Sequence, residues 1–286
     1  MLYDRYVNPL TDFGFKKLFG TEPNKELLID FLNALLDKKI VNLNYSSNEH
    51  VGQTKIDRKA IFDLYCIGEN GERFIVEMQK AKQNYFKDRS VYYASFPIQQ
   101  QAKKKEWNFR LDPVYSVGIL DFVFEDHRHD PALIHRVDLK NQKGETFYDK
   151  LQFVYIELPK FTKTLEELET KLDKWLYVFK HLALLDELPV QLQERIFKKL
   201  FKIAEIAKFN PTERQAYQNS LKYYRDIKNV VDTSREEGRE EGREEGREEG
   251  REERNIEVAK QLKKNKIAVD IIIAATGLTE EQIAKL

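Results

Sequence analysis

Apolar residues near the start of the chain recur at three- and four-residue spacing, which is the period of an amphipathic helix. The pattern covers residues 11–38 and includes Phe15, Leu18 and Leu28. Residues 20–24 interrupt it with a glycine and a proline, and these residue types break helices. We therefore expect two consecutive helices in this part of the chain.

A different pattern begins at residue 39, where the chain turns to strands. The runs 61–67 and 74–79 flank Gly68-Glu69-Asn70-Gly71, and two strand-like runs around such a turn predict a β-hairpin. The elements expected after it are a helix over 81–105, which Pro97 bends or ends, strands over 114–124, 134–140 and 151–158, and helices from 165 to 228.

The sequence Arg-Glu-Glu-Gly occurs four times in residues 235–250. A period of four differs from the 3.6 residues of a helical turn, so no helix face keeps one composition. Ion pairs along such a helix contribute about a few tenths of a kcal/mol each, whereas each glycine costs about 1 kcal/mol relative to alanine. We expect a solvated linker, or a weakly helical arm that stiffens on a partner.

Residues 255–286 predict a small helical hairpin. One helix runs from residue 255 to a stop at Thr276-Gly277, and Thr279 with Gln282 forms a capping box for a last short helix. An oligomerisation or docking hairpin and a DNA-contacting unit are both open. The acidic pair Glu280-Glu281 disfavours the second, because a recognition helix needs basic residues.

Composition limits the class of protein. The chain has 286 residues, of which 41% are hydrophobic, enough for a sizeable core and an appendage. Its single cysteine, Cys66, excludes an intramolecular disulfide and does not imply an oxidising compartment. No apolar run approaches the length of a membrane span, and no signal-peptide pattern follows Met1. We expect a cytoplasmic protein without membrane segments.

Charge is balanced overall, with 48 basic and 48 acidic side chains. Residues 1–110 carry 18 Lys and Arg against 14 Asp and Glu. The basic residues include the run Lys103, Lys104 and Lys105. A basic surface can contact the phosphates of nucleic acid, although most charge runs are solvated surface. These lysines are candidate nucleic-acid contacts, and the second interpretation stays open.

The hairpin brings two acidic residues together if its loop has three residues. Glu69-Asn70-Gly71 suits a type I turn followed by a left-handed residue, and Asp63 is then opposite Glu77. Opposed residues of an antiparallel pair point to one face, with Cβ atoms roughly 5 Å apart. A two-residue Asn-Gly loop would shift the register and place the acids on opposite faces.

Two opposed carboxylates repel each other unless a cation lies between them. A hard divalent cation such as Mg²⁺ binds carboxylate oxygens and retains water. Gln79 shares the strand face of Glu77, while Val76 and Met78 point into a core. The alternative to a metal site is an ordinary, partly exposed strand carboxylate at Asp63.

Five segments together resemble a known class of enzymes. They are Thr11–Gly20, Leu28–Asn33, the hairpin strands with Phe62-Asp63-Leu64 and Phe74–Gln79, Arg89–Tyr93, and Ile119–Phe122. In this order they resemble the PD-(D/E)XK nucleases and, more narrowly, the branch described as nuclease-family transposases or recombination-promoting nucleases. The resemblance covers residues 11 to about 125.

The resemblance implies an α/β fold with a restriction-endonuclease-like core, in which helices flank a mixed central sheet, followed by an α-helical C-terminal region and tail. It implies metal-dependent hydrolysis of phosphodiester bonds in DNA, linked to recombination or mobile elements. The divisions that we expect are a nuclease-like core over residues 1–160, a helical extension over 161–232, the repeat linker or arm over 233–254 and the helical hairpin over 255–286.

The resemblance also implies site residues. The expected catalytic residues are Asp63, Glu77 and Gln79, and the expected ligands of Mg²⁺ or Mn²⁺ are both carboxylates and the backbone carbonyl of Met78. The metal would lower the pKa of a bound water and neutralise charge on the phosphate.

A charged residue of the wider class is missing at one position. That class has lysine where this chain has Gln79, and an amide orients water without carrying charge. Lys80 should point to the opposite face of the strand. Lys82 or Arg89, from the following helix, is therefore the candidate for the missing cation.

Two further pairs of residues have two interpretations each. Asp12 and Lys16 border the active site, as the resemblance suggests, or form a helical i,i+4 ion pair. Tyr92 and Tyr93 pack in the core, which we favour, or stack on a base, which would make Tyr92 a nucleic-acid contact.

Two remaining features are interpreted without a catalytic role. His127 and His129 lie in a loop-like stretch and are assigned no metal. Cys66 should face the apolar side of its strand and belong to the core.

Three functional hypotheses follow. The first is an active DNA endonuclease, and the second is a catalytically weak or inactive DNA-binding or assembly protein that keeps the fold, with Gln79 marking lost catalysis. The third is a protein-interaction module in the helical second half, which would also allow a homo-oligomer. The pair Asp63 and Glu77 favours the first, because an inactive site has no reason to keep two mutually repelling acids.

Overall fold

The computed structural model describes residues 4–47, 49–50, 60–102 and 108–286. The chain divides into two compact units, a first unit over Met1–Lys228 and a second over Asn229–Leu286. The candidate contacts Lys103, Lys104 and Lys105 lie outside the described residues. Within the described ranges, no helix has the length and apolar character needed to cross a bilayer.

Two α-helices open the first unit, as the hydrophobic period predicts. They are α1 (Asp12–Phe19) and α2 (Lys25–Leu36), joined by the 3₁₀ turn η1 (Glu22–Asn24). The Thr11 hydroxyl accepts a 3.0 Å hydrogen bond from the amide of Gly14 and so caps the start of α1. Asp37, in a left-handed conformation, ends α2. The predicted interruption over residues 20–24 is confirmed.

A mixed six-stranded sheet forms the centre of the first unit, with the strand order β1-β4-β5-β6-β8-β7. The strands are β1 (Leu43–Tyr45), β4 (Leu64–Gly68), β5 (Arg73–Gln79), β6 (Val114–Leu120), β7 (Ile134–Lys140) and β8 (Thr146–Glu157). Strands β5, β6 and β8 run parallel, whereas β1, β4 and β7 pair antiparallel with their neighbours. A separate two-stranded sheet pairs β2 (Glu49–His50) with β3 (Ala60–Ile61).

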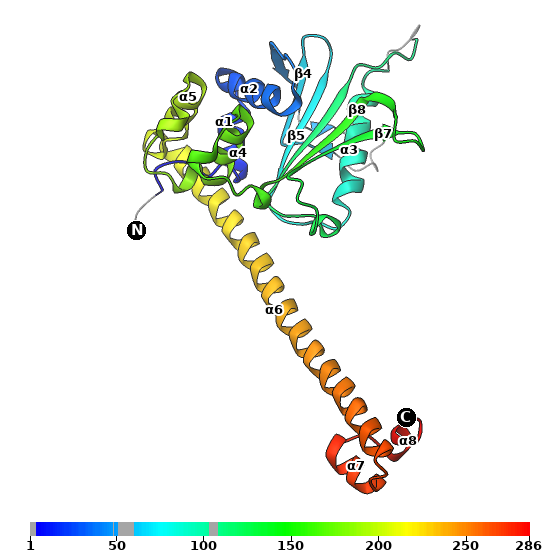
Figure 1. The fold of residues 1–286 in the computed structure, drawn as a ribbon. Coiled ribbons are helices and arrows are strands. Elements are labelled where there is room, and N and C mark those ends of the chain that lie inside the picture. The colour runs from blue at the N-terminus through cyan, green and yellow to red at the C-terminus, as the bar shows by residue number, and fades with distance from the viewer. Residues whose placement is uncertain (1–3, 48, 51–59, 103–107) are drawn as a thin grey trace. The chain divides into compact units, whose positions relative to one another are not determined.

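Helices cover both faces of the sheet (Figure 1). Val76 of β5 points into a core shared with α1, α2, α4 (Lys171–His181) and α5 (Arg195–Ala204). Its neighbour Ile75 points the other way, into a smaller cluster with residues of α3 (Phe86–Gln99). This alternation follows from the two-residue period of a strand. The face that carries Glu77 and Gln79 is therefore the α3 face.

The strand predicted over 61–67 is interrupted, since β3 ends at Ile61 and β4 begins at Leu64. Two other predicted elements are longer than the observed ones. Helix α3 begins at Phe86, and not at residue 81, because Tyr85 before it takes a left-handed conformation with φ 62°. Strand β6 ends at Leu120, and not at residue 124, because the chain then turns toward the end of β8. There the amide of Phe124 donates a 2.7 Å hydrogen bond to the Glu157 carboxylate.

The helices after the sheet share its core. Trp175 of α4 is fully buried, and its ring lies 5.8 Å from that of Phe19 and 5.0 Å from that of Phe197. Its indole Nε1 donates a 2.9 Å hydrogen bond to Asp30. Short 3₁₀ turns join these elements: η2 (Glu125–His127), η3 (Leu158–Lys160), η4 (Leu165–Glu167), η5 (Leu182–Leu184), η6 (Val190–Leu192) and η7 (Ile206–Lys208).

Helix α6 (Pro211–Lys264) includes the Arg-Glu-Glu-Gly repeats, which are helical and exposed. Of the two alternatives for the repeats, a linker or a helical arm, the structure supports the helical arm. In the second unit, α6 ends and is followed by α7 (Val269–Thr276) and α8 (Glu280–Ala284). The single helix predicted from residue 255 is wrong, because Lys266 takes a left-handed conformation with φ 59° and separates α6 from α7. The capping box of Thr279 and Gln282 is confirmed.

Candidate active site

The register of the β4–β5 hairpin determines where the two acidic residues lie. The amide of Gly68 donates a 2.8 Å hydrogen bond to the carbonyl of Glu72, and Gly71 is left-handed with φ 89°. This is the predicted three-residue loop. Leu64 pairs with Val76, so the next position of the same register brings Asp63 opposite Glu77. The predicted register is confirmed.

The backbone of β5 holds Asp63 in place. Its Oδ2 accepts a 2.8 Å hydrogen bond from the amide of Met78. The N–H and C=O of one strand residue point to the same side of the strand, so the carbonyl of Met78 also points toward Asp63. The carbonyl of Gln79 points to the other side, where it accepts from the amide of Asp121 at 2.9 Å. Asp63 and the backbone of Met78 therefore lie together, and the charge of Asp63 acts on Glu77.

The acid pair is poorly solvated and rich in negative charge. Glu77 is only 9% exposed, and its burial, together with the charge of Asp63, raises its pKa to about 7 against the opposing effect of Arg89. Burial also raises the pKa of Asp63, while the hydrogen bond from the Met78 amide opposes that shift. Ionising both acids at neutral pH is unfavourable without a cation between them.

Arg89 of α3 lies beside the acid pair. Its Nη2 donates a 2.8 Å hydrogen bond to Oε1 of Gln79 and lies 3.7 Å from Oε2 of Glu77. The amide nitrogen of Gln79 donates to the carbonyl of Ala81 at 3.2 Å. Both ends of the Gln79 amide are therefore engaged by the protein, and the structure brings Arg89 to the site as one of the two predicted cations.

The other candidate cation, Lys82, is turned away from the acids. Its ammonium nitrogen lies 3.0 Å from Glu125 on the surface. Lys80, by contrast, lies near Asp63, and its other neighbours are Asp12 of α1 and Tyr223 of α6. Both helices contribute to the core on the face opposite α3, so this position agrees with the expected direction of Lys80, away from Gln79.

Several observations place Lys80 next to Asp63. Burial lowers the pKa of the Lys80 ammonium group, while the nearby charges of Asp12 and Asp63 oppose that shift. The ammonium nitrogen lies over the ring of Tyr223 in α6, 4.9 Å from its centroid. A lysine thus faces the first acid, held by an aromatic ring from a distant part of the sequence.

These groups line a hollow of about 430 Å³. Its walls are formed by Asp12, Asp63, Met78, Gln79, Lys80, Ala81, Gln83, Ser220, Tyr223 and Ile227. The ion pair between Lys16 and Asp12, at 2.8 Å, lies at its edge. The pair is thus a helical ion pair, and Asp12 also lines the hollow.

Comparison with protein families identifies the chain. The model of the family described as PD-(D/E)XK nuclease family transposase matches residues 9–234. The protein belongs to this family. Its mixed six-stranded sheet with flanking helices is the restriction-endonuclease-like fold expected of it. Neither the curated proteins nor the solved structures include a match to the chain.

The family match extends well past residue 125, where the sequence resemblance ends, and includes the first part of α6. That part supplies Ser220 and Tyr223 to the hollow. Neither residue carries a signal in the sequence, because each is an ordinary helical residue about 150 positions from the hairpin.

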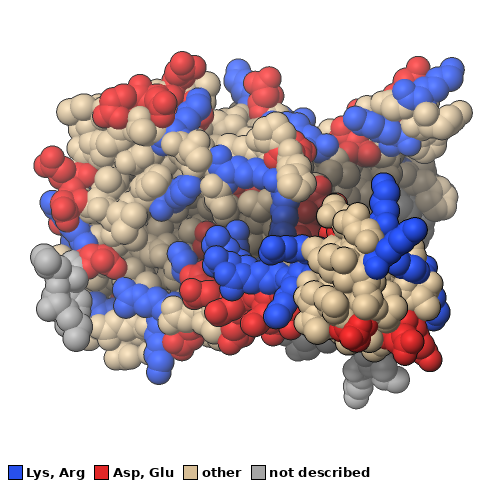
Figure 2. Space-filling view, turned by 60° about the horizontal axis from the view of Figure 1, so that its bottom comes forward, with Lys and Arg blue, Asp and Glu red and all other residues tan. Residues whose placement is uncertain are grey.

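Tyr92 and the surface charges bear on the predicted contact with nucleic acid. Tyr92 is 42% exposed, so the core packing favoured for it is wrong, whereas Tyr93 packs on Phe62 with ring centroids 5.3 Å apart. Basic and acidic side chains alternate over much of the face in Figure 2. Any contact with phosphates on this face must therefore use local groups of basic side chains.

Proposed function

We propose that the protein is a metal-dependent endonuclease that hydrolyses phosphodiester bonds in DNA, in the context of recombination or mobile elements. One observation carries the proposal: Asp63, one position beyond the pair Leu64–Val76, accepts a hydrogen bond from the amide of Met78, and its charge acts on Glu77. Membership of a nuclease family supports the same reaction class.

The donor set fits a hard divalent cation. Asp63, Glu77 and the carbonyl of Met78 offer only oxygen atoms, which Mg²⁺ and Mn²⁺ prefer over imidazole or thiolate. Burial, and after it the charge of Asp63, raise the pKa of Glu77, and a bound divalent ion would favour its ionised form. When bound, the ion supplies an activated water and neutralises charge on the phosphate.

We assign the role of the missing class lysine to Lys80. Its ammonium group faces Asp63 within the hollow, and it is held there by the ring of Tyr223. A partly desolvated ammonium group can orient the attacking water and stabilise the negative charge that develops on the phosphate. Arg89 holds Gln79 and offsets the charge of Glu77, and is therefore a positioning residue.

The experiment is cleavage of supercoiled plasmid DNA by the full chain with Mg²⁺, with and without chelator. The wild type is compared with Asp63→Asn and Glu77→Gln, which keep the size of each side chain and remove its charge. We expect both variants and the chelator to reduce cleavage by at least about 10²-fold, since each removes a ligand or the metal.

Glu69→Gln is the matched control. Glu69 lies in the loop of the same hairpin and is exposed, so its substitution removes an acid away from the hollow and should leave cleavage unchanged. Cleavage that survives both the chelator and Asp63→Asn would contradict the proposed function.

A second candidate is a DNA-binding or assembly protein with little catalysis. The observation in its favour is Gln79, whose amide is hydrogen-bonded at both ends to Arg89 and Ala81 and carries no charge. In this case the wild type would shift DNA in a gel without cutting it, at every Mg²⁺ and Mn²⁺ concentration.

A further inference from the structure

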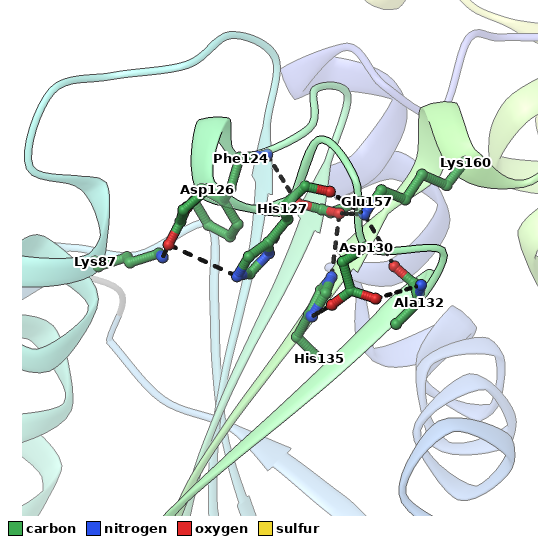
Figure 3. Close-up of polar contacts among 9 residues, drawn as sticks. All are labelled: Lys87, Phe124, Asp126, His127, Asp130, Ala132, His135, Glu157 and Lys160. Atoms are coloured by element: carbon green, nitrogen blue, oxygen red, sulfur yellow. Dashed lines mark hydrogen bonds and ion pairs between the residues drawn. The ribbon is translucent and has the colours of Figure 1, made fainter.

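Three side chains from separate elements converge where β8 ends (Figure 3). Glu157 is the last residue of β8, His135 belongs to β7, and His127 ends the turn η2. Nδ1 of His127 lies 3.3 Å from Oε1 of Glu157, and Nε2 of His135 lies 3.1 Å from Oε2. One ligand atom from each residue lies within 4.8 Å of the other two.

We propose that His127, His135 and Glu157 form a second metal site, which binds a borderline divalent transition ion such as Zn²⁺. Zinc bonds to nitrogen and oxygen are about 2.0–2.1 Å long, so neighbouring ligand atoms of a tetrahedral site lie about 3.3 Å apart. The two nitrogen-to-oxygen distances match this separation. Two imidazoles and one carboxylate leave the fourth position to water.

The outer nitrogen of each histidine faces an aspartate. Nε2 of His127 lies 3.8 Å from Oδ2 of Asp126, and Nδ1 of His135 lies 3.8 Å from Oδ2 of Asp130. Metal-binding histidines characteristically direct their second ring nitrogen to a carboxylate or carbonyl, which fixes the tautomer and orients the ring. If the two histidines served only to balance the charge of Glu157, no aspartate would be required at the outer nitrogen of each ring.

The charges of the cluster favour a cation. Glu157 is fully buried. With neutral imidazoles, the carboxylates of Glu157, Asp126 and Asp130 face two ammonium groups, Lys160 at 2.6 Å from Glu157 and Lys87 at 2.6 Å from Asp126. The group therefore keeps an excess of negative charge, which a divalent ion would remove.

Lys160 does not prevent the ion from binding. Its ammonium nitrogen also donates to the carbonyls of His127 and Ala132, at 2.9 and 3.1 Å. These two carbonyls can hold the Lys160 ammonium group in place when a metal binds the Glu157 carboxylate. Oε1 of Glu157 remains tied to the chain by the amide of Phe124 at 2.7 Å.

The second site differs from the acid pair in place and in chemistry. Glu157 is in register with Leu120, and Leu120 with Gln79, so two strand spacings, roughly 10 Å, separate Glu157 from Gln79. Imidazole ligands select zinc over magnesium. A metal here would tie the β6–β7 connection to the end of β8, and this role does not depend on the proposed nuclease activity.

The test is zinc binding by the full chain without an affinity tag, measured by competition with a chromophoric chelator in excess Mg²⁺. Absorption of bound Co²⁺ reports tetrahedral imidazole coordination independently. We expect one Zn²⁺ per chain, and at least about 100-fold weaker binding in the double variant His127→Gln/His135→Gln.

His129→Gln is the matched control, since His129 is an exposed neighbour of the cluster and should not affect zinc binding. Asp63→Asn should also leave zinc bound, which separates this site from the acid pair. Asp130→Asn, a surface change that leaves the three ligands intact, should weaken binding by about 10–100-fold. Circular dichroism checks that every variant is folded.

Two results would overturn the second site. In the first, Asp130→Asn binds zinc as tightly as the wild type, and the folded double variant His127→Gln/His135→Gln also still binds zinc. The other is loss of the bound zinc in Asp63→Asn, which would assign the ion to the acid pair.

Discussion

The carboxylate of Asp63 accepts a 2.8 Å hydrogen bond from the backbone amide of Met78. This bond attaches the first acid of the pair to the strand that carries the second, so their separation depends on the backbone of the hairpin. A longer acid at position 63 would keep the charge and lose the position.

We therefore predict that Asp63→Glu reduces the turnover number for plasmid cleavage in Mg²⁺ by about 10²-fold, because a misplacement near 1 Å has an effect of this size. The unfolding midpoint in urea should change little, since the charge is conserved. Turnover within about threefold of the wild type would mean that charge alone, without position, is required.

A second prediction concerns the lysine at the end of β5. Lys80→Met keeps the length of the side chain and removes the ammonium group, and it should lower the turnover number by about 10²–10³-fold. Lys82→Met is its matched control, because Lys82 pairs with Glu125 at 3.0 Å on the surface. Equal losses in the two variants would remove the special role of Lys80.

A third prediction compares two left-handed glycines. At Gly144, with φ 80°, an added Cβ meets nothing within 4 Å, so Gly144→Ala should cost about 1 kcal/mol of unfolding free energy from backbone strain alone. At Gly71 the added Cβ would lie 2.6 Å from Oδ2 of Asp112, which pairs with Arg73. Gly71→Ala should therefore cost about 2 kcal/mol. Urea denaturation measures both, and equal values would contradict the role of Asp112.

The hairpin explains how much of the site was predictable from sequence. The three-residue loop follows from the left-handed preference of Gly71, and the opposition of Asp63 and Glu77 follows from that loop. These relations lie within the 15 residues from Asp63 to Glu77, so a pattern in the sequence can reveal them. The helices and strands were predictable for the same reason, apart from ends set by distant contacts such as that of Phe124 with Glu157.

Relations between distant segments were not predictable. Tyr223 reaches Lys80 from α6, and His127, His135 and Glu157 meet only because β7 pairs with β8. The helical state of the repeats was undecided because ion pairs and glycines nearly cancel in free energy. The buried charge of Glu157 at the end of an apolar strand was the one signal in that region that could have indicated a polar cluster.

A fourth prediction concerns the thiol. Burial, with a smaller effect of Glu22, raises the pKa of Cys66 to about 12, so about one thiol in ten thousand is ionised at pH 8. The folded protein should react with a disulfide reagent far more slowly than the chain in guanidinium chloride. Fast reaction of the native protein would mean that β4 opens readily.

A fifth prediction is that residues 235–286 are not needed for DNA cleavage. The family match ends at residue 234, and the first unit ends at Lys228. Deletion of residues 235–286 should leave the rate of plasmid cleavage within about twofold and alter the oligomeric state seen in sedimentation. Loss of cleavage at an unchanged oligomeric state would contradict this division of labour.

The wall that Ser220, Tyr223 and Ile227 provide for the hollow has a consequence for synthesis of the protein. The ribosome makes Asp63 and Glu77 early, yet this wall is missing until residue 227 has emerged. A nascent or prematurely terminated chain would thus carry Asp63 beside an open, unfinished hollow. Under the proposed function, cutting of DNA would begin only when nearly all of the first unit has been made.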